Sequence, residues 1–317
     1  MRSSEARPWA VNHPITPEDE AAVAALRTLA EPHKGQLRGT AAREPFDEIM
    51  GRVPPAVGVT YRADTIGGVP GWWCIPPAAR PGEAILHLHG GFFSWGSARV
   101  YRNFVGQFAE RAGVEAFIPD YRLAPEHPFP AGVLDIQACY QGLVDRGTRR
   151  VALVGDSAGG SLGLVLLRLA SARAASGGVV PVGAVALSPT TDMTLAGPSW
   201  ETRAAADPYF TRDQAVEMIR MYLGDHDLTD PLASPLFGDL AGLPPIRVHV
   251  GEDEMLLDDS LRYVERAAAA GVDARVDVWE GMPHVFLSSV GQWAAADRAL
   301  EAIGSFLAER LATAEAK

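Results

Sequence analysis

The amino-acid sequence predicts an α/β fold in which a mostly parallel sheet is flanked by helices. Short apolar runs alternate with longer segments of helical periodicity from about residue 57 onward. The later runs are separated by roughly 25 residues or more, which leaves room for the crossover helix that joins parallel strands. Hydrophobic residues make up 47% of the 317-residue chain and charged residues 21%, the balance of a globular protein with a sizeable core.

The first 45 residues predict a separate helical piece. Thr16 is a typical N-cap, and Pro17 is a typical first residue of a helix. Apolar residues then recur at helical spacing from Val23 to Leu29, and Gly35 marks the end of the segment.

The candidate strands are apolar runs bounded by turn residues. They span 57–63, 69–75, 84–89, 114–118, 151–154, 182–187, 246–250 and 274–279. The first two are separated by Asp64–Gly68, which predicts a hairpin turn. Ligands of the parallel sheet formed by the others are expected beyond the carboxyl ends of the strands.

One interval is too long for a simple crossover. Between Leu187 and Ile246 the chain holds several aromatic residues and a helical pattern from Thr211 to Leu223. Long loops without structure of their own are uncommon, so we expect an insertion that forms part of a lid. The resulting division assigns 1–45 and 189–231 to a helical cap, and 46–188 and 232–317 to the catalytic core.

Composition argues against several function classes. The chain has 28 Lys+Arg against 39 Asp+Glu, a net charge of −11, and therefore offers no field that would attract nucleic acid. It has no apolar stretch of about 20 residues for a membrane span, and Met1–Pro8 lacks the apolar run of a secretory signal. Cys74 and Cys139 cannot build a disulfide framework and predict buried thiols. We expect a cytoplasmic protein.

The strongest functional signal is Gly155-Asp156-Ser157-Ala158-Gly159, which fits the pattern G-x-S-x-G. A buried strand is predicted before it and a Leu-rich helix after it. Such a turn exposes the serine hydroxyl, and the helix N-terminus favours developing negative charge. An ordinary glycine-rich turn would share the glycines, and a phosphate loop would need a following Gly-Lys-Ser/Thr, which is absent. The context favours Ser157 as a nucleophile.

A second glycine signal, His89-Gly90-Gly91-Phe92, follows the predicted strand 84–89. A serine hydrolase needs N–H donors where the oxyanion forms, and glycines let the backbone approach that oxygen. We predict that Gly90 and Gly91 donate, with the N–H of Ala158 as the third donor. A plain glycine turn is the alternative for this pair taken alone.

His284 is the best placed of the eight histidines to serve as the base. It follows the last predicted strand through the loop 280–283, where the order serine, acid, histidine requires it. His87 and His89 could form a metal pair, but no third ligand cluster accompanies them. We therefore expect hydrogen-bonded core histidines there, and no metal or organic cofactor.

The orienting acid should follow the predicted strand 246–250, where Glu252, Asp253 and Glu254 occur together. One carboxylate is enough to hold the imidazole tautomer and to stabilise the imidazolium. The residues alone do not choose between Asp253 and Glu254.

These motifs together resemble the hormone-sensitive-lipase-like family of α/β-hydrolase carboxylesterases, also called bacterial family IV. The matching segments, in the family's order, are 89–91, 120–126, 155–160 and 281–286. The resemblance implies an α/β-hydrolase fold with eight core strands, the second of them antiparallel. It also implies a cap built from the N-terminus and an insertion after strand six.

Two departures from the family pattern bear on the site. Phe92 stands where the family usually has a third glycine, so we expect its ring to wall the acyl pocket and contact substrate. The family's usual acid is an aspartate, but the matching position holds Glu254, 30 residues before His284 (284 − 254 = 30). The resemblance therefore favours Glu254, with Asp253 as the alternative.

Polar neighbours of these motifs predict a supporting scaffold. Asp156 adjoins the nucleophile, and we predict two roles for it. It would contact the substrate, and it would also belong to this scaffold. Arg122 and Glu126 are close enough in sequence to form an arginine–carboxylate pair that would hold the loops behind the site.

The predicted function is hydrolysis of small, short-chain acyl esters by two-step acyl transfer. A lactone hydrolase or an amide or N-acetyl hydrolase with the same triad is the alternative, because selectivity depends on pocket shape. A catalytically dead ligand receptor is disfavoured, since Ser157 and His284 are both present. The sequence is compatible with a homodimer.

Overall fold

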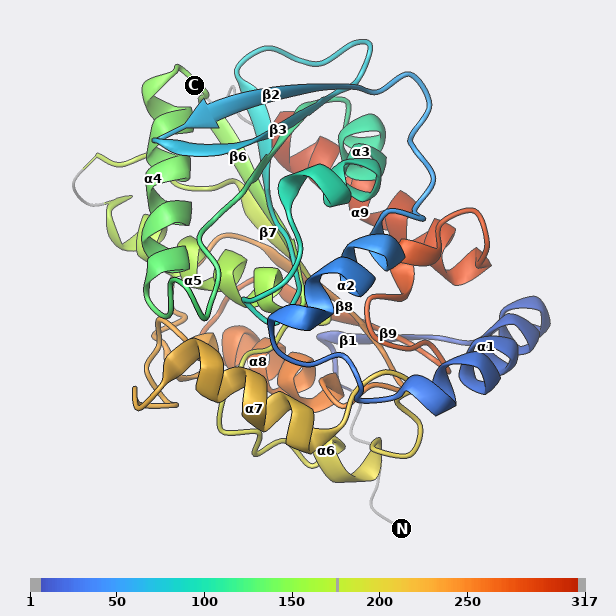
Figure 1. Cartoon of the computed structure of the whole chain (residues 1–317). Coiled ribbons are helices and arrows are strands. Elements are labelled where there is room, and N and C mark those ends of the chain that lie inside the picture. The colour runs from blue at the N-terminus through green and yellow to red at the C-terminus, as the bar shows by residue number, and fades with distance from the viewer. Residues whose placement is uncertain (1–6, 175–176, 313–317) are drawn as a thin grey trace.

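The computed structural model describes residues 7–174 and 177–312, and its centre is a nine-stranded sheet in the order β1-β9-β8-β7-β6-β4-β5-β3-β2 (Figure 1). The strands are β1 Ala10–His13, β2 Thr60–Ile66, β3 Val69–Ile75, β4 Glu83–Leu88, β5 Glu115–Pro119, β6 Arg150–Asp156, β7 Gly183–Leu187, β8 Ile246–Gly251 and β9 Ala274–Trp279. All neighbours are parallel except β3, which is antiparallel to β2 and β5. The predicted α/β-hydrolase fold with its mostly parallel sheet is confirmed.

Helices cover both faces of the sheet. They are α1 Pro17–Ala30, α2 Arg43–Met50, α3 Ala98–Ala112, α4 Ala131–Asp145, α5 Ala158–Ala172, α6 Ser199–Thr202, α7 Arg212–Leu223, α8 Leu257–Ala269 and α9 Ala294–Ala312. Helices α3 and α9 pack on one face, whereas α4, α5 and α8 pack on the other. Successive residues of β6 alternate between these two apolar cores, Val151 on one side and Ala152 on the other.

The sheet has one strand more than the eight expected. Residues Ala10–His13, which fall within the predicted cap segment 1–45, form β1 and pair with β9 from Val276 to Trp279. His13 anchors this short strand, because its Nε2 lies 2.8 Å from Asp277 Oδ1 and its ring stacks on Trp279. Four residues are too few to show the alternation of apolar and polar residues that indicates a strand in a sequence. This strand is therefore recognised only from its tertiary contacts.

Two local predictions are confirmed with shifted bounds. Thr16 caps α1 by accepting a hydrogen bond from the Asp19 N–H at 3.2 Å. The hairpin turn is shorter than predicted, because β2 continues to Ile66 and only Gly67 and Gly68 separate it from β3. Both glycines have positive φ (58° and 82°), which a two-residue turn of this kind requires.

The two segments expected to form a cap contact each other beyond the carboxyl ends of the strands. Lys34 donates to the carbonyl oxygen of Ala204 at 2.5 Å, and Gln214 donates to that of Leu37 at 2.5 Å. Helix α7 begins with a capping box formed by Thr211 and Gln214, where the helical pattern predicted it. In Figure 1, α6 and α7 lie together at one end of the molecule.

Helices within the described part of the chain are all too short or too polar to cross a membrane. Cys74 and Cys139 are buried and unpaired, as predicted. The expectation that Met1–Pro8 lacks a secretory signal stays a prediction. Residues 1–6 of this segment lie outside the described part of the chain.

Candidate active site

Ser157 occupies the sharp turn between β6 and α5. Its backbone has φ 53° and ψ −121°, a strained conformation for a residue with a side chain. A Cβ on Gly155 would collide with the carbonyl group of Gly159, and a Cβ on Gly159 would collide with the carbonyl group of Leu88. The two glycines therefore allow the close backbone packing that holds the serine at the tip of the turn, as the pattern predicted.

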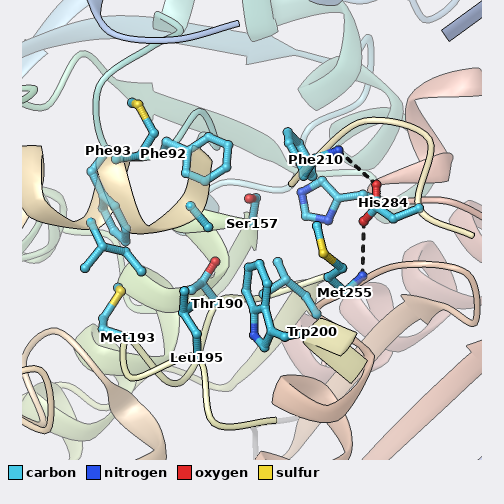
Figure 2. Close-up of a pocket in the computed structure, with 15 residues that line it drawn as sticks. Phe92, Phe93, Ser157, Thr190, Met193, Leu195, Trp200, Phe210, Met255 and His284 are labelled. Atoms are coloured by element: carbon cyan, nitrogen blue, oxygen red, sulfur yellow. Dashed lines mark hydrogen bonds between the residues drawn. The ribbon is translucent and has the colours of Figure 1, made fainter. Parts of the chain in front are cut away.

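Ser157 and His284 line the same pocket, which contains about 490 Å³ of empty space including the part open to solvent. Figure 2 shows the Ser157 hydroxyl between Phe92 on one side and Trp200 on the other, with the imidazole of His284 beside it. The apolar lining residues are Phe92, Phe93, Met193, Leu195, Trp200, Phe210, Ala215, Met218, Ile219, Met255 and Leu256. The predicted pocket contact of Phe92 agrees with this lining.

Glu254 is the acid in contact with the predicted base. Its Oε2 lies 2.5 Å from His284 Nδ1, and both side chains are buried. Its other oxygen, Oε1, accepts hydrogen bonds from the Ser188 hydroxyl at 2.8 Å and from the Gly251 N–H at 2.8 Å. The carboxylate is therefore held in place from two sides while it faces the imidazole.

Asp253, the alternative acid, has arginine partners in place of His284. Its Oδ2 accepts a hydrogen bond from Arg27 of α1 at 2.5 Å, and its Oδ1 lies 3.8 Å from Arg203 Nη1. Both arginines belong to the segments predicted to form a cap, so Asp253 links these segments to the loop after β8. This geometry favours Glu254 as the acid, in the register that the resemblance indicated.

The protonation of His284 sets the expected pH dependence. Burial disfavours the imidazolium, but the charge of Glu254 and its hydrogen bond outweigh burial, so the pKa of His284 is raised above its ordinary value. Asp207 and Asp156 act in the same direction.

A general base must be neutral, so we expect kcat/KM to rise with pH through an acid limb whose midpoint lies above about 6.5. The measurement is a pH profile of kcat/KM for an ester whose leaving group does not titrate in this range. A midpoint at or below about 6 would contradict the dominant effect of Glu254.

In the loop after β4, Gly90 does not fit its predicted role as an oxyanion donor. The N–H of Gly90 donates to Asp156 Oδ1 at 3.1 Å and is already committed. Within the described residues, the N–H groups of Gly91 and Phe92 have no such acceptor, and Phe92 has a φ of 53°. Gly91 and Phe92, together with Ala158 at the start of α5, are therefore the candidate donors.

Asp156 lies behind this loop and does not line the pocket, so its predicted substrate contact is corrected to a scaffold role. Its carboxylate accepts hydrogen bonds from the Gly90 N–H and from the Tyr101 hydroxyl at 3.0 Å. Burial raises the pKa of Asp156 to about 7. A Cβ on Gly90 would collide with this carboxylate, which explains why the first glycine after His89 is needed there.

The predicted pairing of Arg122 with Glu126 is wrong. Arg122 forms a two-pronged pair with Asp135 of α4, at 2.8 and 2.9 Å. Glu126 instead accepts hydrogen bonds from Arg43 at 2.6 and 2.9 Å, which ties the start of α2 to the loop after β5. Both pairs hold loops near the site, but with partners that the sequence did not indicate.

The two strand histidines differ from each other. His89 Nδ1 lies 2.8 Å from the carbonyl oxygen of Gly90, as expected for a hydrogen-bonded core histidine. His87 is equally buried, but neither ring nitrogen has a hydrogen-bond partner among the described residues. Its Nε2 lies 3.9 Å from Asp156 Oδ1, and its ring packs against Tyr101 and Phe108. The expectation of a hydrogen bond is therefore wrong for His87. In the described part of the chain, no group of three or more His, Cys, Asp or Glu residues could hold a metal ion.

Ser188 is a site residue that the sequence analysis missed. It follows β7 with a strained φ of 47° and is fully buried. Its hydroxyl donates to Glu254 and accepts a hydrogen bond from the Val285 N–H at 3.2 Å, so it joins the acid loop to the loop that bears His284. The only sequence signal was its position at a strand's carboxyl end.

Comparison with known proteins shows that the chain is similar to hydrolases. A family described by its alpha/beta hydrolase fold matches residues 85–288. An acetyl-hydrolase of Streptomyces hygroscopicus is 36% identical over 276 residues, covering 86% of this chain and 88% of the relative. An esterase of Acinetobacter venetianus is 34% identical over 284 residues, covering 88% and 92%.

Solved structures extend the similarity to the whole architecture. The crystal structure of an esterase from the bacterial hormone-sensitive lipase family superposes with a TM-score of 0.85 and 37% identity, covering 93% of this chain and 99% of the other. A hormone-sensitive lipase from a metagenome library gives a TM-score of 0.84 and 34% identity, covering 94% and 100%.

Proposed function

The chain belongs to the hormone-sensitive-lipase-like family of carboxylic ester hydrolases with the α/β-hydrolase fold, and we propose that it hydrolyses short-chain acyl esters through Ser157, His284 and Glu254. The observation that supports these roles best is the 2.5 Å contact between Glu254 and His284 beside the pocket that Ser157 also lines. The proposed substrates are small-molecule esters.

The proposed reaction proceeds in two acyl-transfer steps. The Ser157 oxygen attacks the ester carbonyl carbon while His284 Nε2 takes the hydroxyl proton, and Glu254 stabilises the imidazolium that forms. The N–H groups of Gly91, Phe92 and Ala158 bind the oxyanion. His284 then protonates the departing alcohol oxygen, and a water activated by the same imidazole releases the carboxylic acid.

Pocket chemistry supports a short apolar acyl group. Only four lining residues are polar, and they are Ser157, Thr190, Asp207 and His284. Phe92 and Trp200 flank the nucleophile, so a long chain would need these side chains to move. We further propose that the segments 14–45 and 189–231 act together as a cap over this pocket. The homodimer and the cytoplasmic location stay predictions.

A substrate panel tests the proposal. We expect turnover of nitrophenyl esters to be highest for acyl chains of two to about six carbons and to fall for longer chains, with lactones and amides of the same acyl group slower. The measurement is kcat/KM for each compound with the intact chain. A preference for the lactone or the amide at matched acyl size would instead favour the alternative hydrolase.

A further inference from the structure

The insertion between β7 and β8 contributes a buried carboxylate to the wall of the pocket. Asp207 is 1% exposed and lines the pocket together with Ser157 and His284. Its Oδ1 accepts hydrogen bonds from the N–H groups of Tyr209 at 2.9 Å and Phe210 at 3.1 Å. These bonds fold the chain after Asp207 into a tight turn that directs Phe210 toward the catalytic residues.

The same carboxylate also holds the acid loop. Asp207 Oδ2 accepts a hydrogen bond from the Met255 N–H at 3.1 Å, and Met255 directly follows Glu254. Dashed lines in Figure 2 mark the hydrogen bonds of this carboxylate with Phe210 and Met255. One side chain of the insertion therefore connects the cap to the loop that carries the proposed acid.

Phe210 lies between the proposed base and the oxyanion loop. Its ring packs edge-to-face against the imidazole of His284, with centroids 5.0 Å apart and planes at 80°. It packs in the same way against Phe92, at 5.2 Å and 86° (Figure 2). Phe92 has positive φ, a conformation that persists only where surrounding contacts hold it.

The surroundings of the Asp207 carboxylate indicate more than a structural role. Its oxygens are satisfied by N–H groups, whereas Lys34 donates to the carbonyl oxygen of Asp207 and not to its carboxylate. Among the described residues no cationic side chain contacts this carboxylate. A buried carboxylate of this kind is costly, and a neutral side chain could accept some of the same hydrogen bonds more cheaply. A negative charge at this place favours the imidazolium form of His284.

We propose that Asp207 and Phe210 are positioning residues of the catalytic centre, through which the cap holds His284 and Phe92 in their reactive placement. The inference rests on the proposed esterase mechanism and goes beyond it, because it makes the cap a part of the catalytic machinery. An insertion whose aromatic residues formed only its own core would not contact the base and the oxyanion loop.

The Phe210 series tests the ring contacts. We expect Phe210→Leu, which keeps an apolar side chain but loses the ring, to lower kcat about 10-fold to 10²-fold with a smaller change in KM. Phe210→Tyr keeps the ring and should restore most of kcat. The matched control is Phe237→Leu, a half-buried phenylalanine that does not line the pocket. An equal kcat in Phe210→Leu and Phe237→Leu would overturn the proposal.

The charge of Asp207 is tested separately. We expect Asp207→Asn to lower kcat by a similar factor and to move the acid limb of the pH profile to lower pH, because the imidazolium loses a stabilising charge. The matched control is Asp213→Asn, which removes the same charge from an exposed position of α7. It should leave kcat and the acid limb of the pH profile unchanged. An unmoved limb with a normal kcat would contradict the positioning role of Asp207.

Two further measurements separate this inference from the proposed function. The first is the Tm of every variant. If kcat falls only in variants whose Tm also falls, and Phe210→Tyr does not recover kcat, then the role of these residues is purely structural. A fluorophosphonate should still label Ser157 in the Phe210 and Asp207 variants, only more slowly. Absence of labelling in the unmodified enzyme would instead refute the serine mechanism itself.

Discussion

Replacing Ser157 with alanine is expected to lower kcat by about 10⁴-fold or more, because only substrate binding and the oxyanion donors would remain. The fold should be unaffected, since alanine tolerates the strained backbone of the turn no worse than serine does. The measurement is steady-state turnover of a short-chain nitrophenyl ester by a variant whose melting curve matches that of the parent enzyme.

A second variant at the same position separates chemistry from stability. Ser157→Gly should be as inactive as the alanine variant but more stable, by about 1 kcal/mol, because glycine adopts a φ of 53° without strain. Inactivity in both variants, with an unchanged Tm in Ser157→Ala and a raised Tm in Ser157→Gly, would show that the hydroxyl and not the turn geometry was lost. Near-normal turnover in either folded variant would rule out Ser157 as the nucleophile.

Replacing Glu254 with glutamine is expected to lower kcat by orders of magnitude, up to ~10⁴-fold, although the two side chains have the same size. The charge that stabilises the imidazolium of His284 would be lost. His284 Nδ1–H, the Ser188 hydroxyl and the Gly251 N–H all donate to the carboxylate. The NH2 group of a glutamine would face at least one of these donors, and that hydrogen bond would be lost. The acid limb of the pH profile should move down, because Glu254 raises the pKa of His284.

Asp253→Asn is the matched control, one residue away. Asp253 contacts Arg27 and Arg203, and its side chain is 20% exposed, so its ion pairs should contribute little to stability and nothing to the chemistry. We expect kcat within about threefold of the parent and a Tm change of a few degrees at most. An inactive Asp253→Asn beside an active Glu254→Gln would place the acid one residue earlier than the contacts indicate.

Strands β4 to β9 were predictable because each is an almost fully buried run that its own composition reveals. The runs 69–75 and 274–279 were predicted to the residue, and the helix capped by Thr16 followed from local signals alone. β1 was not predictable, since its four residues form a strand only because β9 presents a free edge and His13 can reach Asp277 and Trp279. The segment 1–45, predicted to belong to a helical cap, therefore also contributes a strand to the sheet.

By itself, the sequence determined the family and the fold, and with the family resemblance it indicated the three positions that we propose as catalytic. Each of Ser157, Glu254 and His284 follows a strand, and parallel strands bring their carboxyl ends to one edge. The motifs are local in the sequence, and their meeting at one edge follows from the order of the strands. Both can therefore be predicted from the order of residues along the chain.

The tertiary structure alone decided which groups contact each other at that edge. The Gly90 N–H donates to Asp156, Asp253 accepts a hydrogen bond from Arg27 of α1, and the Ser188 hydroxyl donates to Glu254. Adjacent residues on a loop point in different directions, and packing against distant elements selects among those directions. Hydrogen-bond partners in a buried site therefore depend on three-dimensional packing, which residue order along the chain does not specify.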